Sequence, residues 1–113
     1  MAFSLNSQQI ELRAPWLVAL VQKANTEWIF SKLNLNDHIG NNNGEFDVAT
    51  SGWFRSAKPS SWRLEGTILF AQLQTNSEHG WYGKETSINL DLFIRNKDGS
   101  LAFQKLLVLF IPI

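Results

Sequence analysis

The feature that most constrains this chain of 113 residues is an internal repeat. Offsetting the sequence by 55 positions aligns residues 31–48 with residues 86–103. Five pairs in this window are identical: Asn34/Asn89, Leu35/Leu90, Ile39/Ile94, Asn41/Asn96 and Gly44/Gly99. Unrelated segments of ordinary composition would share about one residue over such a length. The chain therefore encodes one structural unit twice.

The similarity extends upstream of this window. The segment LVALVQ (17–22) resembles LFAQLQ (69–74), and we pair Phe3-Ser4 with Phe54-Arg55. Two copies are too few for a solenoid, which needs three or more stacked units. A chain of this length suits one core. We predict a single pseudo-symmetric domain over residues 1–104, with repeat 1 at about 3–48, repeat 2 at about 54–103, and 105–113 as an apolar C-terminal extension.

The apolar segments of both copies have the composition of β-strands. WLVALVQ and TILFAQLQ are rich in residues that favour a pleated surface, and turn-forming residues bound them. EWIFSKLNL and ETSINL alternate polar and apolar residues, and EFDV and SLAFQ follow as hairpin partners. We predict an all-β fold with about four strands per copy.

The Asn-rich segments between these strands read as turns. Asn36 or Asp37, and Asp91 in the second copy, are candidate caps for one short helical turn. Asn43-Gly44 and Asp98-Gly99 suit tight reversals with positive φ. The preference of Asn for turns does not explain why Asn41 and Asn96, two residues before the reversals, are identical in both copies. Their amides either pin the loop by bonding backbone groups or face a ligand.

Composition excludes several classes of partner. Ten Lys and Arg balance ten Asp and Glu without long runs of one sign, which argues against nucleic acid and anionic membranes. The segment KLLVLFIPI (105–113) is far shorter than the roughly 20 residues of a membrane-spanning helix. The chain has no cysteine and its N-terminus does not resemble a secretory signal. We expect a cytoplasmic protein, with non-classical release as the alternative.

The residues typical of enzymes and metal sites do not form a recognisable pattern. His38 and His79 belong to no spaced ligand set, and we expect His38 to be structural and half-buried. No phosphate loop or nucleophile elbow is present. We predict neither catalysis nor a metal or cofactor. Among the tryptophans, we expect Trp28 and Trp81 to match across the repeats as core residues, and Trp53 and Trp62 to be free for the surface.

The two segments SKLNLNDHIGNNNGEFDV and TSINLDLFIRNKDGSLAFQ resemble the tandem repeats of the cyanovirin-N homology (CVNH) lectins, in particular a cysteine-free fungal-type subset. The resemblance covers residues 3 to about 104. It implies an elongated β-fold in which strands exchange between repeats to form two pseudo-symmetric halves with short helical turns. One half would combine 1–38 with 93–104, and the other would be 39–92. Positions that carry disulfides in many members hold Ser7 and Val21, and Lys58 and Leu73.

The resemblance also implies a shallow sugar pocket on each half. The first-half site would consist of Asn6, Gln22, Lys23, Ala24, Asn25, Arg95, Asn96, Lys97 and Asp98. The second-half site would consist of Asn41, Asn42, Asn43, Thr50, Ser51, Ser56, Gln74, Thr75 and Asn76. In the second site Gly40 stands where the family has an acid, and Ala57 and Asn76 replace a hydroxyl and an arginine. We therefore predict the first-half site to be the stronger one.

By resemblance, the expected function is a lectin that binds mannose-rich glycans through terminal α1,2-linked mannose. Oligomannose glycans or glycoproteins would be the partners, with a homodimer formed through the tail or by domain swapping as a further expectation. The alternative is a protein-interaction module that has lost sugar binding and uses the tail with Trp53 or Trp62.

Overall fold

The computed structural model describes residues 3–105. Its ten strands are β1 (Ser7–Arg13), β2 (Trp16–Gln22), β3 (Trp28–Asn34), β4 (Gly40–Asn42), β5 (Glu45–Asp47), β6 (Arg63–Glu65), β7 (Ile68–Ala71), β8 (Thr86–Asn89), β9 (Ile94–Lys97) and β10 (Ser100–Phe103). Four short 3-10 turns complete the fold: η1 (Phe3–Asn6), η2 (Leu35–Asp37), η3 (Trp53–Ser56) and η4 (Leu90–Leu92). Within residues 3–105, no helix is long and apolar enough to cross a membrane. The all-β prediction is confirmed.

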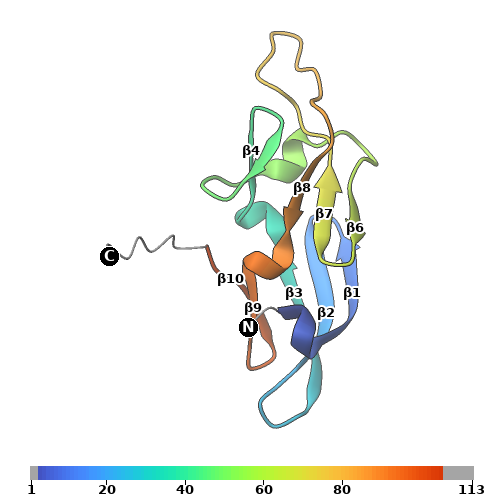
Figure 1. The fold of residues 1–113 in the computed structure, drawn as a ribbon, viewed down its shortest axis with the longest axis vertical. Helices are drawn as coiled ribbons and strands as arrows, with labels where there is room; N and C mark the ends of the chain where they lie inside the picture. The colour runs from blue at the N-terminus through green and yellow to red at the C-terminus, as the bar shows by residue number, and fades with distance from the viewer. Residues whose placement is uncertain (1–2, 106–113) are drawn as a thin grey trace, which may run out of the picture.

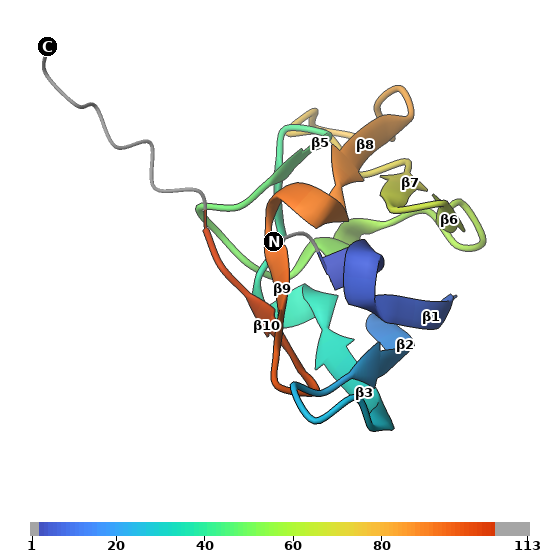
Figure 2. The same ribbon diagram turned by 60° about the horizontal axis from the view of Figure 1, so that its bottom comes forward.

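The strands form two equivalent sets, each a three-stranded antiparallel sheet with a hairpin. One sheet has the order β1-β2-β3 and the other β6-β7-β8, while β4-β5 and β9-β10 are the hairpins. Strand β10 packs against β3, and β5 packs against β8. The C-terminal hairpin thus lies beside the N-terminal sheet (Figures 1 and 2). The predicted exchange of strands between repeats is confirmed, and we call 3–38 with 93–104 the first half and 39–92 the second half.

One continuous core joins the halves. Strand β2 alternates, so that Leu17, Ala19 and Val21 are fully buried, and β7 buries Leu69 and Ala71 in the same way. Side chains on alternate positions of a strand point to one face, which is why this pattern closes a sheet over a core. The helical turns add the two largest fully buried side chains, Trp53 and Phe3, together with Leu35 and Leu90.

The structure shifts our alignment of the N-terminal parts of the repeats by one residue. Phe3 opens η1 and Trp53 opens η3, and both side chains are fully buried. Phe3 is therefore equivalent to Trp53, not to Phe54. The same shift affects the disulfide positions, because Ser7 pairs with Val21 as expected whereas Ala57, not Lys58, pairs with Leu73. Val21, Leu73 and Ala57 are buried, while the Ser7 hydroxyl donates to the carbonyl of Phe3 at 2.6 Å.

The tryptophan predictions are largely wrong. Trp28 is 38% exposed and Trp81 is 67% exposed, so neither is a core residue. Trp53, predicted to be free for the surface, is completely buried. Trp62 is half-buried and packs against Phe54, with ring centroids 4.8 Å apart and the ring planes tilted by 57°. The pairing of Trp28 with Trp81 also fails, because Gln22 faces Trp28 and the equivalent Gln74 faces Tyr82.

The Asn-rich turns form with a corrected cap. The caps of η2 and η4 are the identical residues Asn34 and Asn89, whose side chains accept from the amides two residues on, not Asn36, Asp37 or Asp91. The reversals are as predicted: Asn43 and Asp98 have φ of 50° and 49°, and the glycines after them have φ of 93° and 89°. Two successive residues with positive φ match the twist of a hairpin.

His38 has the structural role predicted for it. Its ring stacks on Phe103 of β10 with centroids 4.9 Å apart, and the side chain is half-buried. Phe93, its counterpart in the second repeat, also stacks on Phe103. The predicted extension 105–113 lies, apart from Lys105, outside the described residues.

Candidate functional site

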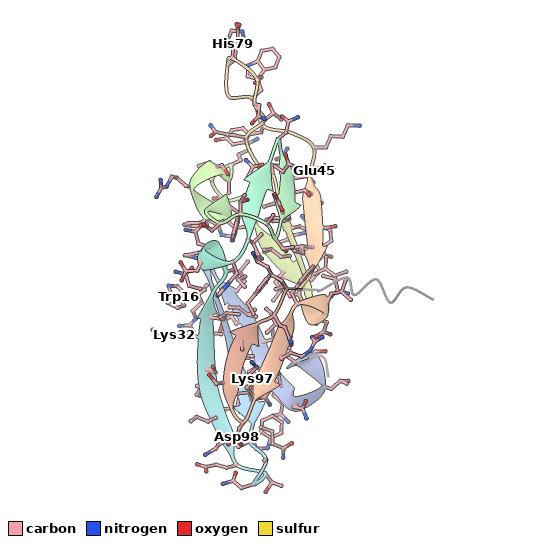
Figure 3. The ribbon with its side chains drawn as sticks, turned by 90° about the vertical axis from the view of Figure 1, so that its left-hand side faces the viewer. Trp16, Lys32, Glu45, His79, Lys97 and Asp98 are labelled. Carbon is pink, nitrogen blue, oxygen red and sulfur yellow. The ribbon has the colours of Figure 1, made fainter. Side chains whose placement is uncertain are left out.

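A polar hollow of about 360 Å³ lies where three distant segments of the first half meet. It is lined by Asn6, Gln22, Lys23, Ala24, Arg95, Asn96 and Asp98. These residues come from the end of η1, the end of β2 with the turn after it, and the β9-β10 hairpin. Every lining residue belongs to the predicted first-half set. Figure 3 shows that Asp98 and Lys97 lie near one end of the long axis.

Two side chains of the β9-β10 hairpin hold this hollow in shape. The Asn96 amide Nδ2 donates to the carbonyl of Gln22 at 2.6 Å, and its Oδ1 accepts from the Gly99 amide at 2.8 Å. Asp98 Oδ1 accepts from the Ala24 amide at 2.9 Å. Asn96 is therefore a pinning residue, while the carboxylate of Asp98 keeps further acceptor capacity because each carboxylate offers about four lone-pair positions.

The first-half hollow is charged. Arg95 and Lys23 bring two cations to its wall and Asp98 one anion. Arg95 is half-buried, and its Nη1 donates to the carbonyls of Asp91 and Ile94, both at 3.2 Å. A guanidinium has five N–H donors, so this anchoring leaves others to meet a ligand oxygen. Asn25 and Lys97, also predicted here, are exposed beside the hollow; Asn25 Oδ1 accepts from the Glu27 amide at 3.0 Å.

The equivalent loops of the second half make the same pinning contacts. Asn41 Nδ2 donates to the carbonyl of Gln74 at 2.7 Å and to Ser56 Oγ at 3.0 Å, while its Oδ1 accepts from the Gly44 amide at 2.7 Å. Asn43 Oδ1 accepts from the Asn76 amide at 2.9 Å. The open question about Asn41 and Asn96 is answered for the free protein, because both amides pin their loops to backbone groups.

The predicted second-half residues do not all meet. Hydrogen bonds join Asn41 to Ser56 and Gln74. A further hydrogen bond joins Asn43 to Asn76, and Thr75 lies between Gln74 and Asn76 in the chain. Thr50 and Ser51 instead line a different hollow of about 290 Å³ with Asp37 and His38, and Asn42 is exposed at the end of β4. No charged residue replaces Arg95, since its counterpart is Gly40. An ideal Cβ on Gly40 would lie 1.9 Å from Thr50 Oγ1, so this position has no room for a side chain.

The connection between β7 and β8 is a feature that sequence reasoning missed. The amide of Lys23 donates to the carbonyl of Glu27 at 2.8 Å, and the equivalent Thr75 amide donates to Trp81 at 2.7 Å. Glu27 and Trp81 therefore occupy equivalent positions, and the second loop is two residues longer. Counting forward from Gln22 and Gln74 would have indicated an insertion, because the next tryptophan comes six residues after Gln22 and seven residues after Gln74.

Two further hollows contain few or none of the predicted residues. The largest, about 790 Å³, lies between the edge strands β1 and β6 and is lined partly by Gln8, Glu11, Trp62 and Arg63. Another, about 460 Å³, lies beside Asn43 and Gly83. Residues 3–105 contain no group of three or more His, Cys, Asp or Glu side chains that could hold a metal ion.

Two β-repeats that exchange strands, with a polar hollow where η1, the end of β2 and the β9-β10 hairpin meet, define a small tandem-repeat β domain. The sequence matches the CVNH domain over residues 3–102, so the chain belongs to the CVNH family. No curated protein matches the sequence.

Solved structures agree with this assignment. A designed cyanovirin-N homolog lectin, LKAMG, is 27% identical, with a TM-score of 0.80 over 92% of this chain and 100% of that one. TbCVNH from T. borchii is 28% identical, with a TM-score of 0.78 over 92% and 100%. Microvirin, solved as a complex with mannobiose, is 28% identical, with a TM-score of 0.72 over 90% and 97%.

Proposed function

We propose that this protein is a non-catalytic lectin that binds mannose-rich glycans, recognising terminal α1,2-linked mannose in the first-half hollow. The observation that carries the proposal is the composition of that hollow. Seven of the nine residues predicted for it line one polar cavity of about 360 Å³. Microvirin, a related CVNH protein, is solved with mannobiose bound.

The chemistry of the hollow suits a neutral sugar. Vicinal hydroxyls are recognised by a donor and an acceptor held at fixed positions, and here Arg95 supplies donors while Asp98 supplies an acceptor. Both side chains are anchored by hydrogen bonds within the protein, so little conformational freedom is lost when a ligand binds. The second half lacks this charged pair, because Gly40 and Asn43 occupy the equivalent positions. We therefore assign α1,2-mannose recognition to the first half.

Titration with α1,2-mannobiose followed by NMR tests the proposal. The backbone amides of Arg95, Asn96 and Ala24 should shift with one common dissociation constant. Arg95→Gly, which installs the residue found at the equivalent position 40, should weaken binding at least about tenfold because a hydrogen bond to a charged group is lost. Incubation with oligomannose should return the sugar unchanged.

Arg55→Gly provides the matched control. Arg55 is an exposed arginine of η3 that does not line the first-half hollow, so its removal changes net charge equally but leaves the site intact. Affinity should be the same as in the unmodified protein. If the amides of the first-half hollow stay unperturbed at millimolar mannobiose, the proposal is wrong.

The alternative function is protein interaction through Trp53 or Trp62 together with the C-terminal tail. The structure removes Trp53 from this set of contact residues. Trp53 is fully buried and cannot contact a partner without unfolding η3. A version lacking residues 106–113 separates the two functions, because a lectin keeps its sugar affinity without the tail.

A further inference from the structure

The outer face of the first-half sheet carries exposed aromatic side chains. Residues that pair across neighbouring strands share a face, and the fully buried residues of β2 point to the core. Phe30 is 65% exposed, and Trp16 and Trp28 are exposed as well. The alternation assigns these residues to the outer face: Trp16, Val18, Leu20 and Gln22 of β2, and Trp28, Phe30, Lys32 and Asn34 of β3.

Two contacts show which way the side chains of β3 point. Ser31 Oγ accepts from the Leu101 amide of β10 at 3.0 Å, so Ser31 points to the β9-β10 hairpin and its neighbours Phe30 and Lys32 point the opposite way. Lys32 Nζ lies 4.7 Å from the centroid of the Trp16 ring, which places both on one face. Figure 3 shows Trp16 and Lys32 together on the side of β3 away from the hairpin. The described residues therefore leave this face open to solvent.

The equivalent face of the second half has a different surface. At the position equivalent to Phe30, 55 residues further along, the second half has Glu85. Its outward ring, Phe70, lies 4.2 Å from the guanidinium carbon of Arg63, which also binds Glu85. An ion pair thus covers the ring of the second half, whereas the rings of the first half are uncovered. Apolar surface with a polar rim is typical of a protein interaction site.

The charges on the first-half face are arranged symmetrically about its central strand. Val18 of β2 pairs with Glu11 of β1 on one side and with Lys32 of β3 on the other. One row across the sheet therefore has an anion at one edge and a cation at the other, each about 4.8 Å from β2. If two copies face each other across a twofold axis that runs along β2, the two edges exchange. Lys32 of each copy then lies over Glu11 of the other, and Val18 and Leu20 meet their own counterparts.

The neighbouring rows fit the same arrangement. Arg13, paired with Trp16, would lie over Asn34 of the second copy, and Gln8 would lie over Phe30, so no like charges meet. A uniformly acidic or uniformly basic partner would instead meet repulsion at one edge.

Glu11 is available for a contact with a second copy. Its pair with Arg13, at 3.4 Å, is exposed and therefore weak, and a carboxylate can accept from a second cation. Three strands of seven residues present a face of roughly 23 by 14 Å, which is at the small end of specific interfaces. We therefore expect a weak, concentration-dependent association.

We propose that the outer face of the first-half sheet is a homodimer interface, in which two sheets pack face to face about a twofold axis along β2 and Glu11 pairs with Lys32 of the second copy. Sheets packed in this way lie about 10 Å apart, with their strands within about 30° of each other. The interface does not depend on sugar binding. It does leave the two β2 strands parallel, so both first-half hollows, which form at the end of β2, lie at the same end of the dimer.

Sedimentation equilibrium of the full chain over a range of concentrations tests the inference. The unmodified protein should show a monomer–dimer equilibrium. Phe30→Glu, which installs the residue found at the equivalent position 85, should raise the dissociation constant at least about tenfold, because a charge would be buried against apolar side chains. Leu92→Glu is the matched control, since Leu92 is 50% exposed on η4 and lies outside the face. It makes the same change of charge and should leave the dissociation constant unchanged.

Exchanging the two charges tests the twofold arrangement itself. Glu11→Lys and Lys32→Glu should each raise the dissociation constant about tenfold, because each dimer would contain the repulsive contact twice. The double variant Glu11→Lys/Lys32→Glu restores opposite charges and should dimerise within about threefold of the unmodified protein. A protein that stays monomeric at every concentration contradicts the inference. So does a dimer that Phe30→Glu leaves intact, or a double variant that associates no better than the single ones.

Discussion

The hairpin reversals at the two ends of the molecule have the same backbone geometry, but one carries charged side chains and the other carries neutral ones. At one end the hairpin reversal presents Arg95 and Asp98 with Lys23 nearby, and at the other end the equivalent residues are Gly40, Asn43 and Thr75. The residues that stay identical, Asn41 and Asn96 with the glycines after them, make matching hydrogen bonds to the backbone. Identity between repeats therefore marks what builds the loop, and difference marks what the loop is free to bind.

The largest expected contrast is between two tryptophans of the second half. Trp53→Ala should lower the free energy of unfolding by roughly 3–5 kcal/mol, because it empties a fully buried site in the core. Trp81→Ala should change it by less than about 0.5 kcal/mol, since the ring is mostly exposed. Urea unfolding measures both. Trp53→Phe should cost less than Trp53→Ala, because the ring volume is partly kept and the buried Nε1, which has no hydrogen-bond partner, is removed.

Exchanging small and large residues between the equivalent positions 40 and 95 should have unequal effects. Gly40→Ala should destabilise the fold by about 1–3 kcal/mol, because its Cβ would meet Thr50 Oγ1 and the Thr50 carbonyl carbon, which lies 2.8 Å away. Arg95→Gly, the reverse change, should have a smaller effect on stability while reducing sugar binding. Thermal unfolding of the two variants compares them. Equal destabilisation would mean that the halves do not differ in packing at this position.

Removing either pinning amide should destabilise its own half by similar amounts. Asn41→Ala and Asn96→Ala each break side-chain bonds to a backbone carbonyl and a glycine amide, for a loss of about 1–2 kcal/mol. Hydrogen exchange should show faster opening of β4-β5 in the first variant and of β9-β10 in the second. Asn42→Ala, at an exposed neighbouring position, serves as the control and should leave both hairpins unaffected.

The smallest expected effect concerns an exposed ion pair on the β6-β7-β8 sheet of the second half. Arg63 covers the ring of Phe70 and binds Glu85, whose hydrogen bond lowers the pKa of that carboxyl below its ordinary 4.5. A carboxyl with a depressed pKa stabilises the fold above its unfolded pKa, and this contribution disappears as the pH falls through the folded value. Glu85→Gln should therefore slightly flatten the loss of stability in acid. The difference should shrink in high salt because the pair is exposed.

The sequence predicted the repeat and the β-fold because those depend on local pattern, and the residues carried over from the family resemblance include the seven that line the first-half hollow. Asn43-Gly44 and Asp98-Gly99 are pairs that favour positive φ in hairpin turns, so their turns could be placed without a structure. The tryptophans could not be placed in the same way. Trp53 is buried because it occupies the position of Phe3, and a one-residue error in aligning the repeats moves it to the surface. Trp81 lies at the position of the exposed Glu27, not of Trp28, and the prediction missed the two-residue insertion that causes this difference.

The separation of Thr50 and Ser51 from the rest of the predicted second-half site has a similar cause. Residue-by-residue transfer assumes that the chain after β5 follows the same path as in relatives. Here Thr50 packs against Gly40 and lines another hollow with His38. Only the path of the backbone decides this, and it depends on long-range packing.

The exchange of strands also determines the order in which the two halves can be completed during synthesis. During synthesis the N-terminal sheet emerges first, yet the hairpin β9-β10 that covers its core face is made last. The second half, residues 39–92, is continuous and has all its strands before the first half is complete. The second half of a nascent chain would therefore be complete before the first half. The first-half hollow, which needs Asn6 beside Arg95, forms only when these two segments meet.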